Sequence, residues 1–209
     1  MSVVLGFNRA AIYPGLIVHV RTSSLLGSTL RWSMTRWLRR QYPDCENQVW
    51  GNHDAMLVGI EGCVVGVGEA IPSGNMVTSL ERYNWLMQEG QYQCRVYKVA
   101  DQSKAVHAQA AANWMKHIRG TSYDMLAFPR LAFKSLVWSF WDKPVGLKKA
   151  RYCSESVQES WFEYPPHIDV LGDRNATPMH TEMRAGLLPQ KPWQRITLED
   201  VTDEMLQVV

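Results

Sequence analysis

Residues Arg151 to Val157 read R-Y-C-S-E-S-V. Cys153 follows an aromatic residue and opens a helix-like run that continues to Trp161. A cysteine in the first turn of a helix lies near the positive end of the helix dipole, which favours the thiolate over the thiol. The stretch therefore predicts a nucleophilic cysteine at the N-terminus of a helix.

A thiolate nucleophile needs a base, and His53 is the candidate that the sequence offers. It leads one strand-like run, residues 53–60, and a second run, residues 63–70, follows after Glu61-Gly62. Two such runs around a short glycine-containing connection predict a β-hairpin.

The register of this hairpin decides whether Glu69 lies on the same face as His53, where it could accept a hydrogen bond from the imidazole. A three-residue loop would pair Gly59 with Cys63 and set His53 directly opposite Glu69, on the same face. A two-residue loop would send Glu69 to the other face. We predict the first register, because a histidine base needs a group that orients its ring.

Composition favours one globular domain over residues 1–209, with a loop-rich tail from about residue 169. The chain has 46% hydrophobic and 20% charged residues and a net charge of +2, which gives no reason to expect nucleic acid as a partner. No signal peptide or membrane span is expected, so the cytoplasm is the default location. Export by another route and a phage origin both stay open.

The four cysteines, Cys45, Cys63, Cys94 and Cys153, include no C-x-x-C pair. A zinc ribbon or thioredoxin-type site therefore has no support, and neither a metal nor another cofactor is expected. A disulfide framework is not expected in a long chain without an export signal. Three of the four are predicted to be buried apolar residues, and Cys153 differs because of its neighbours.

The other patterns predict an α+β fold in which an antiparallel sheet packs against helices. His19, in the first of the strands, is interpreted as a core or rim histidine, and His107 as a packed one. Beside the hairpin, strands are expected at 16–21, 76–83 and 92–99. Helices are expected at 25–41, from Asp101 or Ser103 to 118, over the aromatic stretch 125–141 and from 197, and short elements near 179–185.

The helix at residues 25–41 has two different faces. Leu30, Met34, Trp37 and Leu38 fall on one arc, whereas Arg36, Arg39 and Arg40, with Trp32 among them, fall on the other. The second face is either a solvated basic surface or a contact for an anionic substrate, a membrane surface or a partner.

Four short motifs together resemble one family. Tyr152-Cys153-Ser154-Glu155 resembles the Tyr-Cys-Ser-Glu-Leu signature of the YiiX-like permuted papain-fold amidases and peptidases, relatives of the NlpC-type cell-wall hydrolases. Asn52-His53, followed by L-V-G-I at 57–60, is similar to that family's histidine-bearing strand, and V-G-E-A at 67–70 is similar to the strand after it. Tyr123-Asp124 resembles a Tyr-Asp pair that the family often has between its histidine and its cysteine. The order of histidine before cysteine is the permutation itself.

The resemblance covers roughly residues 13 to 185, with two departures. Ser156 stands where the family usually has leucine, and the strand after Pro14-Gly15 lacks the expected aspartate. The resemblance implies a papain-like fold, with Cys153 as nucleophile and His53 as general base and acid.

Glu69 is then the group that orients the imidazole. The oxyanion would be held by the Cys153 backbone N–H and a second donor, for which Tyr152 and His19 are weak candidates. Trp32 is a weak candidate for substrate contact.

The implied reaction is hydrolysis of an amide or peptide bond through a thioester, with peptidoglycan stem peptides as one candidate substrate. Three alternatives stay open. The chain could be a thiol acyltransferase or lipid esterase like lecithin:retinol acyltransferase, with the aromatic stretch beside an acyl chain. It could be a binding module without catalysis, or an unrelated α+β domain in which Cys153 and His53 are ordinary buried residues.

Overall fold

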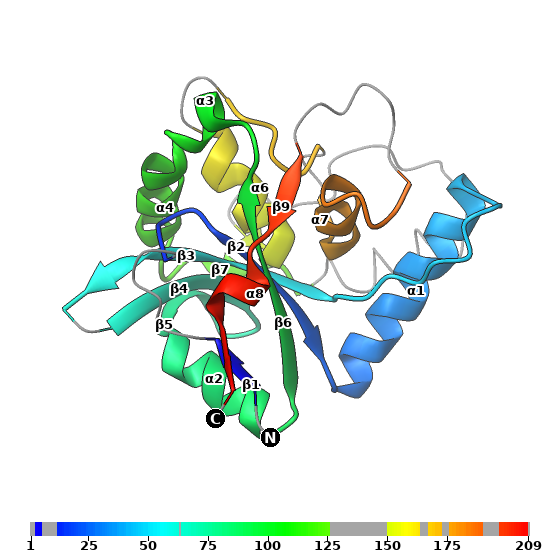
Figure 1. The fold of residues 1–209 in the computed structure, drawn as a ribbon, viewed down its shortest axis with the longest axis horizontal. Coiled ribbons are helices and arrows are strands. Elements are labelled where there is room, and N and C mark those ends of the chain that lie inside the picture. Colours follow the sequence, from blue (N-terminus) through cyan, green and yellow to red (C-terminus); the bar gives the residue numbers. More distant parts are fainter. Residues whose placement is uncertain are drawn as a thin grey trace.

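A six-stranded antiparallel sheet forms the centre of the fold (Figure 1). The computed structural model describes residues 3–5, 12–62, 64–125, 150–163, 167–172, 176–189 and 197–208. The strand order is β5-β4-β3-β2-β6-β9, and each neighbouring pair is antiparallel. The predicted α+β class, with an antiparallel sheet and several helices, is confirmed.

The sheet consists of β2 (Ile17–Thr22), β3 (His53–Glu61), β4 (Val64–Ile71), β5 (Gly74–Ser79), β6 (Tyr92–Val99) and β9 (Leu198–Asp200). Two small pairs join β1 (Val3–Leu5) with β10 (Leu206–Val208) and β7 (Ser122–Tyr123) with β8 (Ala150–Arg151). The helices are α1 (Leu25–Gln41), α2 (Leu80–Gln88), α3 (Gln102–Ala105), α4 (Ala108–His117), α6 (Cys153–Phe162), α7 (Pro178–Arg184) and α8 (Thr202–Met205).

Strand alternation gives the sheet two buried faces, because successive side chains point to opposite sides. Ile17 and Met56 pack on one side in a cluster with residues of α4 and α6. Val18 and Leu57 pack on the other side with α2 and α8. Figure 1 shows α4 and α6 above the sheet and α2 below it. The nucleophile helix of the prediction is therefore held against the sheet by its own apolar residues.

A third cluster lies beside the sheet and joins α1 to α7. Leu30, Met34 and Leu38 of α1 pack with Met179 and Met183 of α7. The apolar arc predicted for this helix is thus buried, and α1 has the bounds predicted for it. Of the helices in the described part of the chain, none is long and apolar enough to cross a membrane.

The predicted hairpin forms, but the predicted register is wrong. Gly59 pairs with Gly66, and Glu69 lies opposite Ala55. The pairing of Glu61 with Val64, continued without interruption, would put Glu69 opposite Met56 and away from the face of His53. A β-bulge between Leu57 and Gly59 inserts one residue into β3 and restores that face.

Gly59 makes this bulge possible, because its φ of 127° lies in the region that only glycine enters easily. The result places Glu69 diagonally across from His53, two residues further along and on the same face. Diagonal neighbours of this kind are within reach of long side chains. His53 and Glu69 are therefore in contact as predicted, but as diagonal neighbours and not as a directly opposed pair.

Three other predictions about local structure need correction. The strand expected at 76–83 ends at Ser79, whose side chain accepts a hydrogen bond from the Arg82 backbone N–H and starts α2 instead. The helix expected from Asp101 is divided into α3 and α4 at Val106 and His107. The helix expected from residue 197 begins at Thr202, after β9. The aromatic stretch 125–141 lies, except for Met125, outside the described residues.

Candidate functional site

Cys153 is the first residue of α6, as the sequence predicts. Its side chain packs with Ala70, Tyr123 and Tyr152, and the residue is 5% exposed. The first N–H groups of a helix have no partner within the helix, so they remain available to an anion at this position. The thiol therefore lies at the positive end of a ten-residue helix that is packed against the sheet.

His53 is the first residue of β3, and its ring forms a hydrogen bond with the buried carboxylate of Glu69. Its Nε2 lies 3.1 Å from Oε2 of Glu69, which is 2% exposed. Thr78 donates a hydrogen bond to Oε1 of the same carboxylate at 2.9 Å, and Tyr83 donates to Oε2 at 2.7 Å. Glu69 is thus held on both oxygens, and Nδ1 is the ring nitrogen left for the thiol.

The electrostatics of His53 connect it to Cys153. Burial by itself would lower the pKa of His53, but hydrogen bonds with the Cys153 side chain and with Glu69 raise it to about 10. Burial would raise the pKa of Glu69, whereas the hydrogen bonds from His53, Tyr83 and Thr78 bring it below its ordinary value. The arrangement favours an imidazolium at His53, between the Glu69 carboxylate and the Cys153 sulfur.

The structure thus brings together Cys153, His53 and Glu69. Tyr152 is also near, since it precedes Cys153 and packs in the same buried cluster. Trp32 does not join them, because it is 54% exposed on the outer side of α1. His19 has a different environment and is described next.

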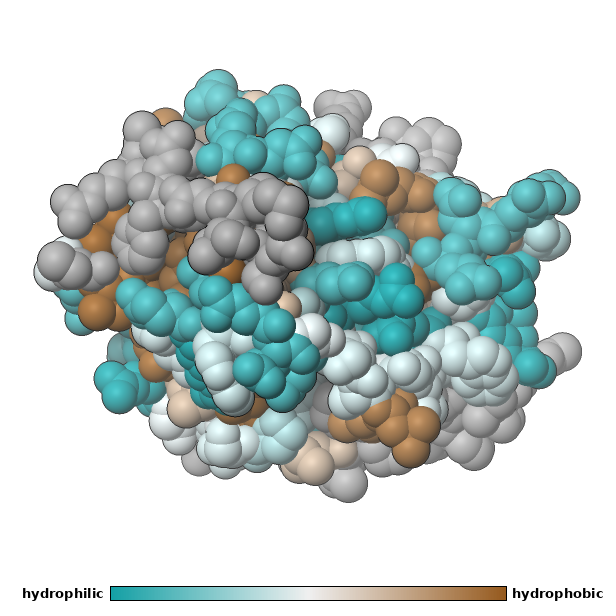
Figure 2. All heavy atoms as spheres, turned by 60° about the horizontal axis from the view of Figure 1, so that its bottom comes forward, coloured by the Kyte–Doolittle hydropathy of each residue, from teal (hydrophilic) through white to brown (hydrophobic). Residues whose placement is uncertain are grey.

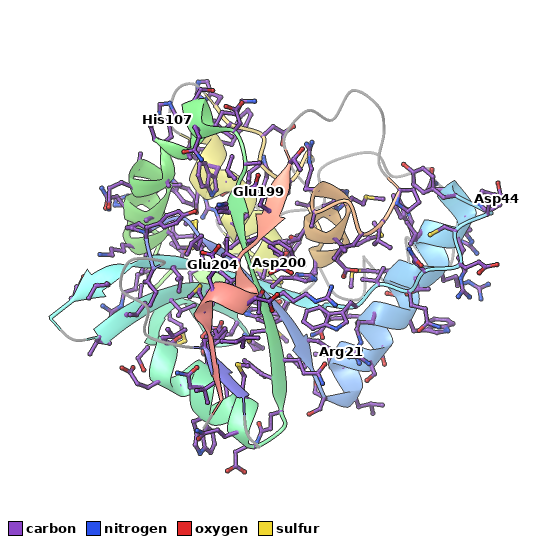
Figure 3. All side chains as sticks on the ribbon, in the orientation of Figure 1. Arg21, Asp44, His107, Glu199, Asp200 and Glu204 are labelled. Carbon is purple, nitrogen blue, oxygen red and sulfur yellow. The ribbon has the colours of Figure 1, made fainter. Side chains whose placement is uncertain are left out.

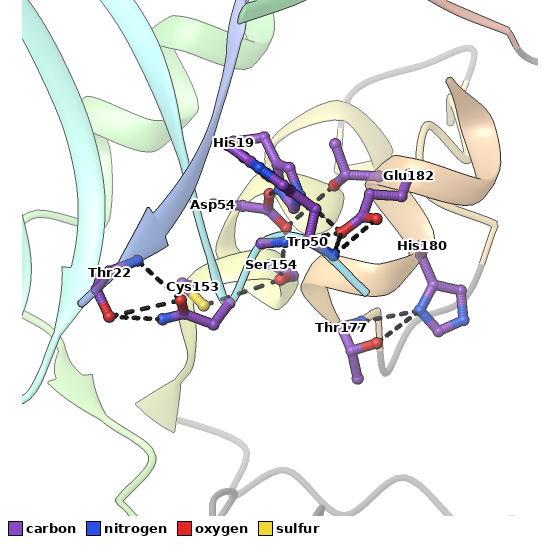
Figure 4. A network of polar contacts seen from close by, with 12 residues as sticks. His19, Thr22, Trp50, Asp54, Cys153, Ser154, Thr177, His180 and Glu182 are labelled. Atoms are coloured by element: carbon purple, nitrogen blue, oxygen red, sulfur yellow. Dashed lines mark hydrogen bonds and ion pairs between the residues drawn. The ribbon is translucent and has the colours of Figure 1, made fainter. Parts of the chain in front are cut away.

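His19 is fully buried between two carboxylates (Figure 4). Its Nδ1 lies 2.6 Å from Asp54, and its Nε2 lies 3.1 Å from Glu182. Burial would lower the pKa of His19, but the two acidic partners raise it to about 9. Both ring nitrogens are occupied, so the structure does not present His19 as an oxyanion donor. Its interpretation as a core histidine fits this position.

The same buried network reaches the neighbours of both Cys153 and His53. Asp54 follows His53, and its Oδ2 accepts hydrogen bonds from Ser154 at 2.7 Å and from Thr181 at 3.1 Å. Ser154 follows Cys153 in α6. The network therefore connects β3, which carries His53, to α6, which carries Cys153, through the residue that follows each of them.

Glu182 of α7 fixes the segment that leads into His53. Its carboxylate accepts hydrogen bonds from the backbone N–H groups of Trp50, at 2.9 and 3.0 Å, and of Gly51, at 2.8 Å. The ring of His19 fits closely here, because a Cβ on Gly51 would come within 2.1 Å of His19 Nε2. Sequence reasoning missed both carboxylates. Asp54 could have been found because it directly follows His53, but nothing in the sequence points to Glu182, which is 129 positions beyond His53.

Glu155 adds a titratable group to the first turn of α6. Burial and the nearby Glu159 raise its pKa to about 7. A charged carboxylate at a helix N-terminus would compete with a thiolate for the same N–H groups and dipole. Around neutral pH a fraction of the Glu155 side chains is protonated, which reduces that competition.

Within the described ranges, no group of three or more histidine, cysteine or acidic side chains is arranged to hold a metal ion. Comparison with known proteins adds no family assignment: no protein-family model matches the chain, and a search of curated proteins found no match.

Proposed function

We propose that this protein is a cysteine hydrolase of the permuted papain-like type that cleaves an amide or peptide bond. The observation that carries the proposal is the convergence of Cys153, at a helix N-terminus, with His53, whose other ring nitrogen is bound to the buried Glu69. A nucleophile, a base and an orienting acceptor in this order are the parts that acyl transfer requires.

In the proposed reaction the Cys153 thiolate attacks the substrate carbonyl carbon, and a tetrahedral oxyanion forms. The backbone N–H of Cys153 at the start of α6 supports the oxyanion. His53, which carries the proton in the resting ion pair, gives it to the leaving amine, and a thioester remains. His53 then removes a proton from water, and the hydroxide breaks the thioester and releases the acid.

The experiment that tests this proposal is turnover of a panel of peptide amides, including peptidoglycan stem peptides, by the wild type and two variants. Cys153→Ala and His53→Ala should each abolish turnover, whereas the fold, followed by circular dichroism, should persist. Retained turnover in Cys153→Ala would refute the assignment.

Selective labelling of the thiol gives a test that needs no substrate. Iodoacetamide at neutral pH should modify Cys153 before the other cysteines, because a thiolate is the reactive species. Burial and the charge of Glu69 raise the pKa of Cys94 to about 12, so this buried cysteine provides the internal control. Peptide mass spectrometry identifies the labelled position, and faster labelling of Cys94 would contradict the proposal.

The panel should also contain acyl esters and an acceptor alcohol. Turnover of these esters without turnover of amides would assign the same Cys153–His53 pair to the esterase or acyltransferase reaction instead. Labelling of Cys153 with no turnover of either class would favour a binding module.

A further inference from the structure

The outer side of α1 combines basic, aromatic and aliphatic side chains. At 100° per residue, Leu25, Trp32, Arg36 and Arg39 share one arc, opposite the buried Leu30, Met34 and Leu38. Leu25 is 86% exposed and Trp32 is 54% exposed, and both arginines are exposed. Leu26, which is 52% exposed, lies about 100° around the helix from Leu25, between this arc and the buried one. We call these five exposed residues the α1 outer face.

Charge on this helix has a single sign. The 17 residues of α1 include four arginines and no acidic residue. Arg21 lies near the start of the helix, and Asp44 lies beyond its far end (Figure 3). Figure 2 shows mainly hydrophilic side chains on the right of the molecule, the side on which α1 lies.

Trp32 and Arg36 are one turn apart and contact each other. The Arg36 guanidinium lies 5.7 Å from the centre of the Trp32 ring, within the range of a cation–π contact. A tryptophan ring has an apolar body and a polar N–H, and it is favoured where hydrocarbon meets headgroups. Arginine binds phosphate oxygens with two parallel hydrogen bonds.

We propose that the α1 outer face docks the protein on a lipid surface that contains anionic headgroups. The arginines complement the negative charge of such a surface, and each contributes to attraction within about 10 Å at 0.1 M salt. Leu25, Leu26 and Trp32 supply apolar side chains that enter the boundary between headgroups and acyl chains. Nucleic acid would satisfy the arginines but would leave the two exposed leucines in water.

The docked face lies close to the segment that leads into His53. The inner side of α1 touches Asn52, since a Cβ on Gly27 would come within 2.9 Å of the Asn52 side-chain nitrogen. Arg31 donates hydrogen bonds of 2.8 Å to the Asn52 side chain and to the Thr22 carbonyl. The bound surface and Asn52, the residue before His53, are therefore separated by roughly the 10 Å diameter of one helix. The docking proposal does not depend on the proposed reaction.

The test is sedimentation of the full chain with vesicles of phosphatidylcholine alone and of phosphatidylcholine mixed with phosphatidylglycerol. We expect binding to the mixed vesicles and weaker binding as salt is raised. The double variant Trp32→Ala/Arg36→Gln should bind at least about tenfold more weakly, because it loses one charge and the interfacial ring.

The chain offers a matched control on α2. Trp85 is 55% exposed, and Arg82 is exposed on the same helix, but α2 also carries Glu81 in its first turn. Trp85→Ala/Arg82→Gln removes the same residue types and should bind the mixed vesicles like the wild type.

Four outcomes would overturn the docking proposal. They are no binding to the mixed vesicles, equal binding to neutral vesicles, equal losses in the two double variants, and retention on an RNA homopolymer without binding to vesicles. Urea unfolding of both variants checks that each is folded in the assay.

Discussion

The Glu69 carboxylate is fixed on both oxygens, and this determines how firmly the His53 ring is held. Thr78 binds one oxygen, and Tyr83 and His53 share the other. A carboxylate held in this way cannot rotate to follow solvent, so it orients the imidazole and stabilises its proton. In the proposed reaction Glu69 therefore positions His53 and does not touch the substrate.

Replacing Glu69 by glutamine keeps the shape but removes the charge that helps to raise the pKa of His53. If the reaction needs the imidazolium, wild-type activity falls as pH rises through about 10, where His53 loses its proton. In Glu69→Gln this fall should move to lower pH, and kcat/KM near neutral pH should drop roughly 100-fold. A pH–rate profile measures both effects, with the exposed Glu199→Gln as control. An unchanged alkaline limb would argue against the assigned role.

His19 should make stability depend on pH in the alkaline range. Its pKa is raised from 6.5 to about 9 in the folded state, so the stabilisation is complete below pH 6.5. It is lost as pH rises through about 9, and it amounts to about 3 kcal/mol. Urea unfolding of the wild type between pH 6 and 10 should show this loss, and His19→Gln should flatten it. The exposed His117→Gln should leave the wild-type slope, and a flat wild-type curve would contradict the prediction.

At the scale of elements, β3 and α6 are joined by a buried hydrogen bond one residue beyond each candidate catalytic residue. Ser154 donates to Asp54 at 2.7 Å, and both residues are fully buried. Because β3 carries His53 and α6 carries Cys153, this bond fixes the start of the helix against the strand. It limits how far the side chains of Cys153 and His53 can move apart.

Two buried serines on α6 allow this bond to be measured. Ser154 donates to a carboxylate, whereas Ser160 donates to the Ser156 backbone carbonyl at 2.6 Å. Ser154→Ala should lower the free energy of unfolding by about 2 kcal/mol and Ser160→Ala by about 1 kcal/mol, because bonds to charged groups are stronger. Ser154→Ala should also slow the labelling of Cys153, which Ser160→Ala should not. Equal rates in the two variants would show that the Ser154 bond does not position the thiol.

Sequence patterns predicted most elements because their signals are local. The period of α1, the alternation in β6 and the cysteine at the start of α6 each lie within one segment. The hairpin register was wrong because a bulge depends on the conformation of Gly59, for which the alternating pattern gives no signal. The carboxylate of Glu182 was missed because its partners lie more than 130 positions away in the chain.

At the scale of the whole molecule, Glu182 connects segments that are distant in sequence. It lies on α7 and binds His19 of β2 and the backbone that precedes β3. This joins the helical pair of α1 and α7 to the central sheet through buried charge as well as through apolar contacts. Breaking one partner of such a network leaves the others buried and uncompensated.

Glu182→Ala should therefore destabilise the protein by about 3–5 kcal/mol in urea unfolding at neutral pH. The exposed pair of Lys98 and Glu199, 3.2 Å apart, is the comparison. Glu199→Gln should cost at most about 1 kcal/mol, because water screens a surface ion pair. Similar losses in the two variants would mean that the His19 network contributes little net stability.

The bulge in β3 decides which changes of chain length the site can tolerate. Deleting Val58 would remove the inserted residue and leave Leu57 opposite Val67, so His53 and Glu69 would still share a face. Deleting Met56 would move His53 to the opposite face from Glu69. Both residues are buried in the same cluster, so each deletion weakens the core. Selective labelling of Cys153 should survive the first deletion and not the second, which makes Val58 the position where this hairpin absorbs a one-residue deletion.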